Sequence, residues 1–267
     1  QVDPAQRTVR AQGGATWADV DTATQRYGLA TPGGAVSTTG IAGLTLGGGL
    51  GWLRRKYGLS CDNLLSVDVV TADGHFISAS RDENAALFWA LQGGGGNFGV
   101  VTNFEYQLHP VGPEVLFLLI FYPMAQARAL LANWRDFMQT APDEFSSNAF
   151  FWTVPPAPFL PATAHGQRVL VMAGMYAGPV AEGAALVEPL RHLATPVADL
   201  TGPMPYVAVQ SSLDAVFPAH ELHHYWKSHY LNSLDERVID ALARDVETAP
   251  SPMTLVDLWA MGGAVGR

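Results

Sequence analysis

The alternation of apolar and polar residues predicts a regular order of short strands and helices in the first hundred residues. Thr16 and Asp19 have the spacing of a capping box at the start of a helix. Asp73 and Gly74 form a turn of the type that joins two strands of a hairpin. The predicted elements are a strand at 6–12, a helix at 16–27, a hairpin at 65–71 and 75–79, a helix at 83–91 and a strand at 100–108.

A cluster of proline and glycine marks the best boundary in the chain, at His109-Pro110 and Gly112-Pro113. Beyond it, long alternating runs are separated by helical repeats, which favours an α+β layer of antiparallel strands and helices. We therefore expect two domains, at 1–112 and 113–267. The second half is predicted to hold strands at 114–122, 148–154, 168–176, 223–231 and 254–261, and helices at 124–140, 180–194 and 233–248.

Composition narrows the partners of this chain. Of the 267 residues, 48% are hydrophobic and 15% charged, which is typical of a globular protein with a large core. The formal net charge of −9, with one short basic cluster at 54–56, argues against a nucleic-acid surface. The longest apolar run, residues 115–122, is strand-sized, so no membrane span is predicted. One cysteine excludes an internal disulfide and leaves the cellular compartment open.

The stretch from Gly33 to Asn63 is too rich in glycine for an ordinary helix and too apolar for a linker. Glycines permit positive φ angles and close approach of the backbone to a ligand. Hydroxyls and main-chain N–H groups at such turns can hold phosphate oxygens without a metal. The first hypothesis is therefore a nucleotide-type cofactor.

Two short motifs suggest other sites. Gly94, Gly96 and Gly99 match a dinucleotide fingerprint, but a helix precedes them and a strand follows, which is the reverse of what that site needs. His220-Glu221-x-x-His224 matches a zinc-hydrolase motif, which requires a helix. On the strand predicted here, the two histidines would lie about 13 Å apart, too far for one zinc. Both motifs are weaker hypotheses than the glycine-rich stretch, and no metal is expected.

Cys61 and the basic cluster have ordinary interpretations. Cys61 has no neighbouring base and is interpreted as a small packing residue. Arg54, Arg55 and Lys56 are interpreted as a solvated face, although their place after the glycine turns leaves open a contact with a pyrophosphate.

Two long stretches carry a family resemblance, PGGAVSTTGIAGLTLGGGLGWLRRKYGLSCDNLLSVDVVTADG from Pro32 and LFWALQGGGGNFGVVTNFEYQLHP from Leu87. They resemble the berberine-bridge-enzyme-like FAD-linked oxidases of the vanillyl-alcohol-oxidase class. YWKSHYL from Tyr225 and the closing WAMGGAVGR are similar more weakly. The resemblance implies the second part of a PCMH-type FAD-binding domain at 1–112, followed by a substrate-binding α+β domain with a helix-flanked antiparallel sheet at 113–267.

The resemblance also implies which residues approach FAD. The Ser-Thr-Thr-Gly run would line the pyrophosphate and the edge of the flavin ring, and nearby glycines would allow close approach. An asparagine would brace the loop, and two valines would meet the adenine end through their backbone. The implied residues are Ser37, Thr38, Thr39, Gly40, Gly43, Gly48, Gly49, Asn63, Val100 and Val101.

Two departures from the family pattern concern attachment of the flavin. Val36 stands where some members have a cysteine bonded to the flavin, so that thioether is not expected. The family's flavin-linked histidine lies upstream of Gln1, and the family continues beyond Arg267. The sequence therefore indicates a middle piece of a longer enzyme, with a C-terminally incomplete second domain.

In this family, FAD takes a hydride from an alcohol or amine carbon and molecular oxygen reoxidises it. The resemblance thus implies an oxidase of a small molecule, either a secondary metabolite or a sugar. Alternation along the predicted strand at 223–231 places Tyr225, Lys227 and His229 on one face, as candidates for the catalytic base. A scaffold that binds no cofactor is the main alternative, and a zinc hydrolase is the weaker one.

Overall fold

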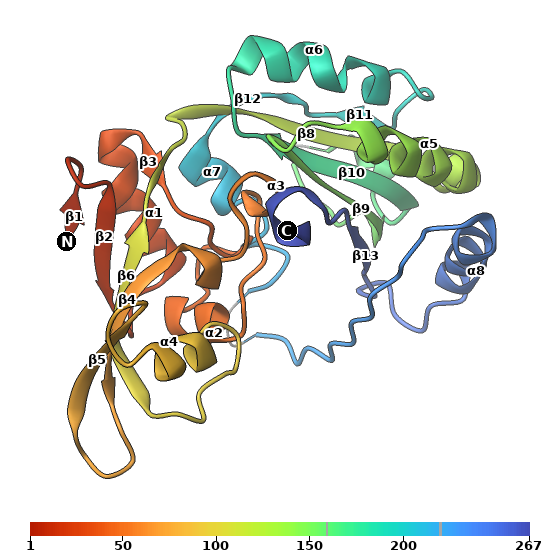
Figure 1. Ribbon diagram of the computed structural model, residues 1–267. Helices are drawn as coiled ribbons and strands as arrows, with labels where there is room; N and C mark the ends of the chain where they lie inside the picture. Colours follow the sequence, from red (N-terminus) through yellow and green to blue (C-terminus); the bar gives the residue numbers. More distant parts are fainter. Residues whose placement is uncertain (159, 219–220) are drawn as a thin grey trace. The chain divides into compact units, whose positions relative to one another are not determined.

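The structure is a computed structural model that describes residues 1–158, 160–218 and 221–267. It divides into two compact units (Figure 1). Unit 1 comprises Gln1–Val115, Met204–His223 and Met261–Arg267, and unit 2 comprises Leu116–Pro203 and His224–Ala260. The expected domain at 113–267 therefore gives three segments, 113–115, 204–223 and 261–267, to unit 1. Long-range packing of these segments decides this grouping, and local sequence patterns do not report such packing.

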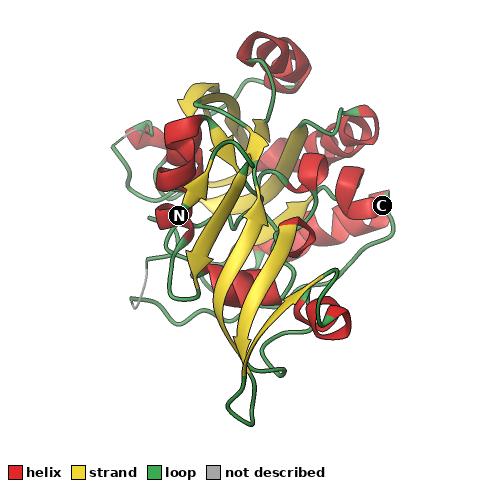
Figure 2. Ribbon diagram, turned by 60° about the vertical axis from the view of Figure 1, so that its left-hand side comes forward, coloured by secondary structure: helices red, strands yellow, loops and turns green. Residues whose placement is uncertain are grey.

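Unit 1 is built on a five-stranded antiparallel sheet with the strand order β1-β2-β6-β4-β5. Figure 2 shows strands of this sheet side by side, with the β4–β5 hairpin at its edge. The hairpin closes through the predicted turn, where the N–H of Thr71 bonds to the carbonyl of His75. The strands are β1 (Val2–Asp3), β2 (Thr8–Gln12), β4 (Leu64–Val70), β5 (Phe76–Ser80) and β6 (Val100–Gln107).

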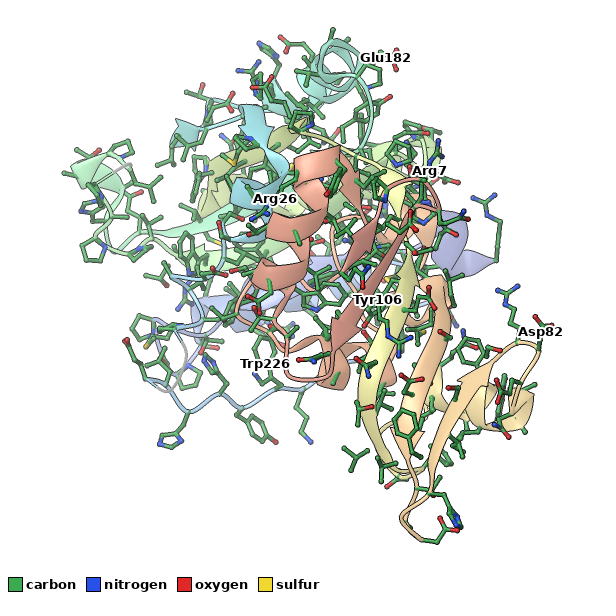
Figure 3. The ribbon with its side chains drawn as sticks, turned by 90° about the vertical axis from the view of Figure 1, so that its left-hand side faces the viewer. Arg7, Arg26, Asp82, Tyr106, Glu182 and Trp226 are labelled. Atoms are coloured by element: carbon green, nitrogen blue, oxygen red, sulfur yellow. The ribbon has the colours of Figure 1, made fainter. Side chains whose placement is uncertain are left out.

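Three helices bury their apolar sides against this sheet: α1 (Trp17–Thr24), α2 (Ile41–Leu46) and α4 (Ala85–Leu91). The predicted capping box starts α1, because the Thr16 hydroxyl accepts from the N–H of Asp19 and the Asp19 carboxylate accepts from the N–H of Thr16. Inside the core, the hydroxyl of Tyr106, a residue labelled in Figure 3, lies 2.8 Å from that of Thr45. This bond satisfies two buried polar groups and ties α2 to β6.

Shorter elements complete unit 1. A two-residue pairing joins β3 (Leu29–Ala30) to β7 (His109–Pro110), so the predicted boundary residues also close this unit. The C-terminal turn η5 packs against α3 (Figure 1). The remaining elements are η1 (Gln25–Tyr27), α3 (Arg54–Tyr57), η2 (Cys61–Asn63), α7 (Tyr206–Gln210) and η5 (Gly263–Gly266).

Unit 2 is an antiparallel sheet with the order β11-β8-β10-β9-β13, to which β12 adds by pairing with β8. Its long central strands pair in continuous register, from Val169 opposite Pro123 to Tyr176 opposite Leu116. The strands are β8 (Glu114–Pro123), β9 (Phe145–Thr153), β10 (Arg168–Tyr176), β11 (Ala198–Asp199), β12 (Gly202–Pro205) and β13 (Val256–Trp259).

The helices of unit 2 share one apolar core with the sheet. In α5 (Ala127–Thr140), residues Leu130, Leu131, Trp134 and Met138 are buried at helical spacing. The other elements are α6 (Val180–Arg191), α8 (Glu236–Glu247), η3 (Met124–Gln126) and η4 (Ala162–Ala164). Within the described residues, no helix is both long and apolar enough to cross a bilayer.

The predicted fold class is confirmed, but one predicted strand is wrong. Residues 223–231 form no strand, and Tyr225 and Tyr230 are 84% and 79% exposed. Alternating aromatic and polar residues suggested a half-buried strand. However, alternation alone does not make one, because a strand also needs a neighbouring strand with which to pair.

We expect Gly51→Ala to destabilise unit 1 by about 3 kcal/mol or more, because overpacking against rigid backbone has few ways to relax. A Cβ at this position would lie 1.7 Å from the carbonyl oxygen of Gly33. Chemical denaturation measures the effect. Gly14→Ala is the control, because a Cβ there meets nothing within 4 Å. Equal stability of the two variants would contradict the observed backbone packing.

Candidate cofactor site

The glycine-rich stretch forms one continuous part of unit 1. It runs through a loop at 33–40, the helix α2, a turn at 47–53, the helix α3 and the short turn η2. We refer to residues 36–40 as the Ser-Thr loop. These residues include four of the ten predicted FAD contacts.

The Ser-Thr loop lies across the first turn of α1. The N–H of Trp17 donates to the Thr39 carbonyl at 3.0 Å, and the N–H of Ala18 donates to the Ser37 carbonyl at 2.9 Å. Beyond the loop, the N–H of Ile41 donates to the Ala15 carbonyl at 2.9 Å. Helices leave their first N–H groups without partners inside the helix. In α1, the N–H groups of Trp17 and Ala18 bind the Ser-Thr loop instead.

Ser37 has a partner that the sequence analysis missed. Its N–H and its hydroxyl donate to the two carboxylate oxygens of Asp214, at 2.8 and 2.6 Å. Ser37 is buried, whereas Thr38 and Gly40 are exposed. No local signal could have identified Asp214, because 177 positions separate it from Ser37.

The predicted glycines fall into two kinds. Gly48 and Gly49 have φ angles of 108° and 94°, which favour glycine, and the N–H groups of Cys61 and Ser60 donate to their carbonyls. A Cβ on Gly49 would lie 2.4 Å from the Ser60 hydroxyl. Gly43 is different, because it is exposed on α2 and a Cβ there meets nothing within 4 Å. Gly40 has the same open space.

Asn63 holds the end of the stretch together. Its side-chain N–H₂ donates to the carbonyls of Tyr57 and Leu59, both at 2.8 Å. Its oxygen is left as the acceptor for Nε2 of His109, at 2.7 Å. The His109 ring stacks on Tyr57 with centroids 3.9 Å apart. Burial, with smaller contributions from Lys56 and Arg7, lowers the pKa of His109 to about 4, so the ring is neutral and carries its proton on Nε2.

Val100 and Val101 begin β6, opposite Val70 and Val69 of β4. Val100 is exposed and Val101 is buried. In the glycine run before them, the N–H of Gly95 donates to the carbonyl of Leu46 at the end of α2. The structure thus brings this glycine run beside the glycine-rich stretch.

The basic cluster is not the solvated face that its composition suggested. Arg54 and Arg55 are 0% and 5% exposed, and Nη1 of Arg54 donates to the Gly51 carbonyl at 3.1 Å. The reason is tertiary, because η5 covers α3. Cys61 is also buried, and burial raises the pKa of its thiol to about 11, which agrees with a packing role.

The three candidates for the base lie on the exposed segment described above. Tyr225, Lys227 and His229 are exposed, and the Lys227 ammonium lies 5.6 Å from the centre of the Tyr225 ring. Trp226, labelled in Figure 3, is on the same segment. Their catalytic role stays a prediction.

His220 of the zinc motif lies outside the described residues. Its predicted partner His224 is in a segment without helix. Across the described parts of the chain, no group of three His, Cys, Asp or Glu side chains is arranged to hold a metal ion.

Comparison with known proteins identifies the cofactor. Residues 1–80 match the family model described as an FAD binding domain. An FAD-linked oxidoreductase of Dictyostelium discoideum is 32% identical over 268 residues, which is 99% of this chain and 56% of that protein. The chain is a relative of the FAD-linked oxidoreductases. It spans a little over half the length of such relatives.

Solved structures agree with this assignment. The crystal structure of 6-hydroxy-D-nicotine oxidase from Arthrobacter nicotinovorans matches with a TM-score of 0.80 and 26% identity, over 98% of this chain and 57% of that one. A berberine bridge enzyme variant described as a reticuline dehydrogenase matches with a TM-score of 0.77 at 20% identity, over 98% and 53%, and shows the fold alone. The predicted FAD cofactor and PCMH-type fold are therefore confirmed.

A buried carboxyl lies beside the Ser-Thr loop. Asp21 of α1 is 1% exposed and accepts a hydrogen bond of 2.9 Å from the Gln210 side chain. Burial raises the pKa of Asp21 to about 7, and the Gln210 bond offsets part of this rise. Burial, with a contribution from the Asp21 charge, also raises the pKa of Tyr206.

We expect Asp21→Asn to remove a pH dependence of stability. The folded chain binds a proton at Asp21 up to about pH 7, whereas the unfolded value is 3.8. The free energy of unfolding therefore falls as pH rises between these values. Asparagine stays neutral, so the variant should be more stable at pH 8, on the order of 2–4 kcal/mol. Denaturation at pH 5 and pH 8 measures this; parallel pH profiles for the two proteins would contradict it.

Proposed function

We propose that this chain belongs to a flavin-dependent oxidase that oxidises an alcohol or amine carbon of a small molecule and passes the electrons to oxygen. The observation that carries the proposal is the match of residues 1–80 to an FAD binding domain. Within those residues, Thr38, Gly40 and Gly43 are exposed. A segment of this kind offers hydroxyl and main-chain donors to a ligand at close range.

The donors available here suit FAD on chemical grounds. The arginines that follow the glycine turns are buried, so we assign the cofactor's phosphates to hydroxyl and main-chain donors. Open positions at Gly40 and Gly43 leave space for a flat ring or a diphosphate. The residues that the family resemblance proposes as contacts are Ser37, Thr38, Thr39, Gly40, Gly43, Gly48, Gly49, Asn63, Val100 and Val101.

Bound FAD supplies hydride acceptance, and the protein orients the substrate and takes the proton from its oxygen or nitrogen. Tyr225, Lys227 and His229 are the proposed groups for that proton, since each carries a nitrogen or oxygen that can exchange one. The similarity to 6-hydroxy-D-nicotine oxidase supports an amine as the first substrate class to test, ahead of alcohols and sugars. A similar structure, the berberine bridge enzyme variant, is described as a dehydrogenase, so the electron acceptor has to be tested separately.

We expect Gly43→Leu to weaken FAD binding at least tenfold, because the side chain would fill the open space on α2 that the cofactor needs. Leucine also has a higher helix propensity than glycine, so the fold should not suffer. Titration of the purified chain with FAD, followed by flavin fluorescence, measures the affinity. Gly14→Leu, at another open glycine, is the control.

Equal FAD affinity in both glycine variants would contradict the placement of the cofactor at α2. A wild-type chain that binds no added FAD would instead favour the cofactor-free scaffold.

We expect loss of the catalytic base to slow flavin reduction by about 100-fold or more. Tyr225→Phe, Lys227→Met and His229→Gln test the three candidates in the FAD-loaded protein, with Tyr230→Phe as a control from the same exposed segment. Stopped-flow absorbance under anaerobic conditions, with amine substrates, measures the rate. If all three variants reduce flavin at the wild-type rate, the base lies elsewhere.

The acceptor can be tested in the same protein. Substrate-dependent oxygen uptake with formation of hydrogen peroxide is the result expected of an oxidase. Reduced flavin that persists in air would show a dehydrogenase instead.

A further inference from the structure

Asp214 holds Ser37 by two hydrogen bonds at once. The N–H and the hydroxyl of Ser37 point to different oxygens of one carboxylate, at 2.8 and 2.6 Å. Hydrogen bonds to an ionised acceptor are shorter and stronger than those between neutral groups. No lysine, arginine or histidine among the described residues pairs with Asp214 in a salt bridge. The described partners of this carboxylate are therefore the donors of Ser37.

A second residue of the segment Met204–His223 binds the loop at 33–40. Gln210, four positions before Asp214, is 1% exposed. Its side-chain N–H₂ donates to the Gly34 carbonyl at 3.2 Å and to Asp21 at 2.9 Å. Both of its N–H groups are thus used, one on the loop and one on α1. Gln210 and Asp214 together hold the loop at Gly34 and at Ser37.

Ser37 is fixed on its other side by α1. Its carbonyl accepts from the N–H of Ala18, so all three polar groups of Ser37 have protein partners. The next residue, Thr38, is exposed, whereas the Thr39 carbonyl accepts from the N–H of Trp17 and the Thr39 N–H donates to the Val36 carbonyl at 3.2 Å. The hydrogen bonds of Ser37 therefore fix the backbone from which Thr38, Thr39 and Gly40 reach the surface.

We propose that Asp214 is a positioning residue of the FAD site, which clamps Ser37 so that Thr38–Gly40 are presented to the cofactor. Ser37 then contributes no donor of its own to FAD, in contrast to the role that the family resemblance implied for it. This inference rests on the proposed placement of FAD at the Ser-Thr loop. It gives the segment Met204–His223 a function, namely to pre-organise a loop that lies far away in the sequence.

The test is a double-mutant cycle with Ser37→Ala and Asp214→Ala, measured by FAD affinity in the purified chain. Asp214→Ala should weaken FAD binding about tenfold. Adding Ser37→Ala to it should change the affinity no further, because the two residues act as one unit. Asp214→Asn keeps one acceptor oxygen and should fall between wild type and alanine. Asp82→Ala, which removes a carboxylate from the exposed turn labelled in Figure 3, should bind FAD like the wild type.

A second readout needs no cofactor. In the FAD-free chain, Asp214→Ala should raise the hydrogen-exchange rate of the amides of Ser37 and Thr39 at least tenfold, and Asp82→Ala should leave it unchanged. Additive losses of FAD affinity would overturn the inference, since they would mean that Ser37 binds FAD directly. Unchanged exchange would also overturn it. If the wild-type chain binds no FAD although exchange responds as expected, the proposed function fails and the clamp has no cofactor to serve.

Discussion

The close approach of two backbone segments at Gly33 and Gly51 is the constraint on which the rest of unit 1 depends. Neither position tolerates a Cβ. A Cβ on Gly33 would lie 2.5 Å from the ring of Trp17, and a Cβ on Gly51 would lie 1.7 Å from the Gly33 carbonyl oxygen. Trp17 is fully buried and stands at the start of α1. The tryptophan, the loop and the turn before α3 are therefore stacked without space between them. This stacking brings the Ser-Thr loop across the first turn of α1.

Neutral polar groups, in preference to charges, organise the region around that loop. Asn63 and a neutral His109 close one end, and Gln210 joins the loop to α1 at the other. Amide groups satisfy buried carbonyls without the desolvation cost of an ion. Asp214 and Arg54 are exceptions, since the Asp214 carboxylate binds Ser37 twice and the Arg54 guanidinium donates to the Gly51 carbonyl.

Local patterns predicted those features whose physical cause is local. The capping box at Thr16, the Asp73-Gly74 hairpin and the strand at 168–176 depend on neighbouring residues, and all three are present. The return of Met204–His223 to unit 1 depends on contacts such as Gln210 with Asp21, which no periodicity encodes. The burial of Arg54 is likewise invisible in a run of three basic residues. The strand predicted at 223–231 was wrong because alternation says nothing about a pairing partner.

Some glycines of the stretch are required by close packing within the fold, and others have no close neighbour that requires them. Gly49 and Gly51 are required by Ser60 and by Gly33, so their presence would be expected with or without a cofactor. Gly43 has no such neighbour, lies inside α2 and has no positive φ angle. A glycine inside a helix costs about 1 kcal/mol relative to alanine. No part of the described chain accounts for that cost, and the FAD contact that we propose for Gly43 would explain it.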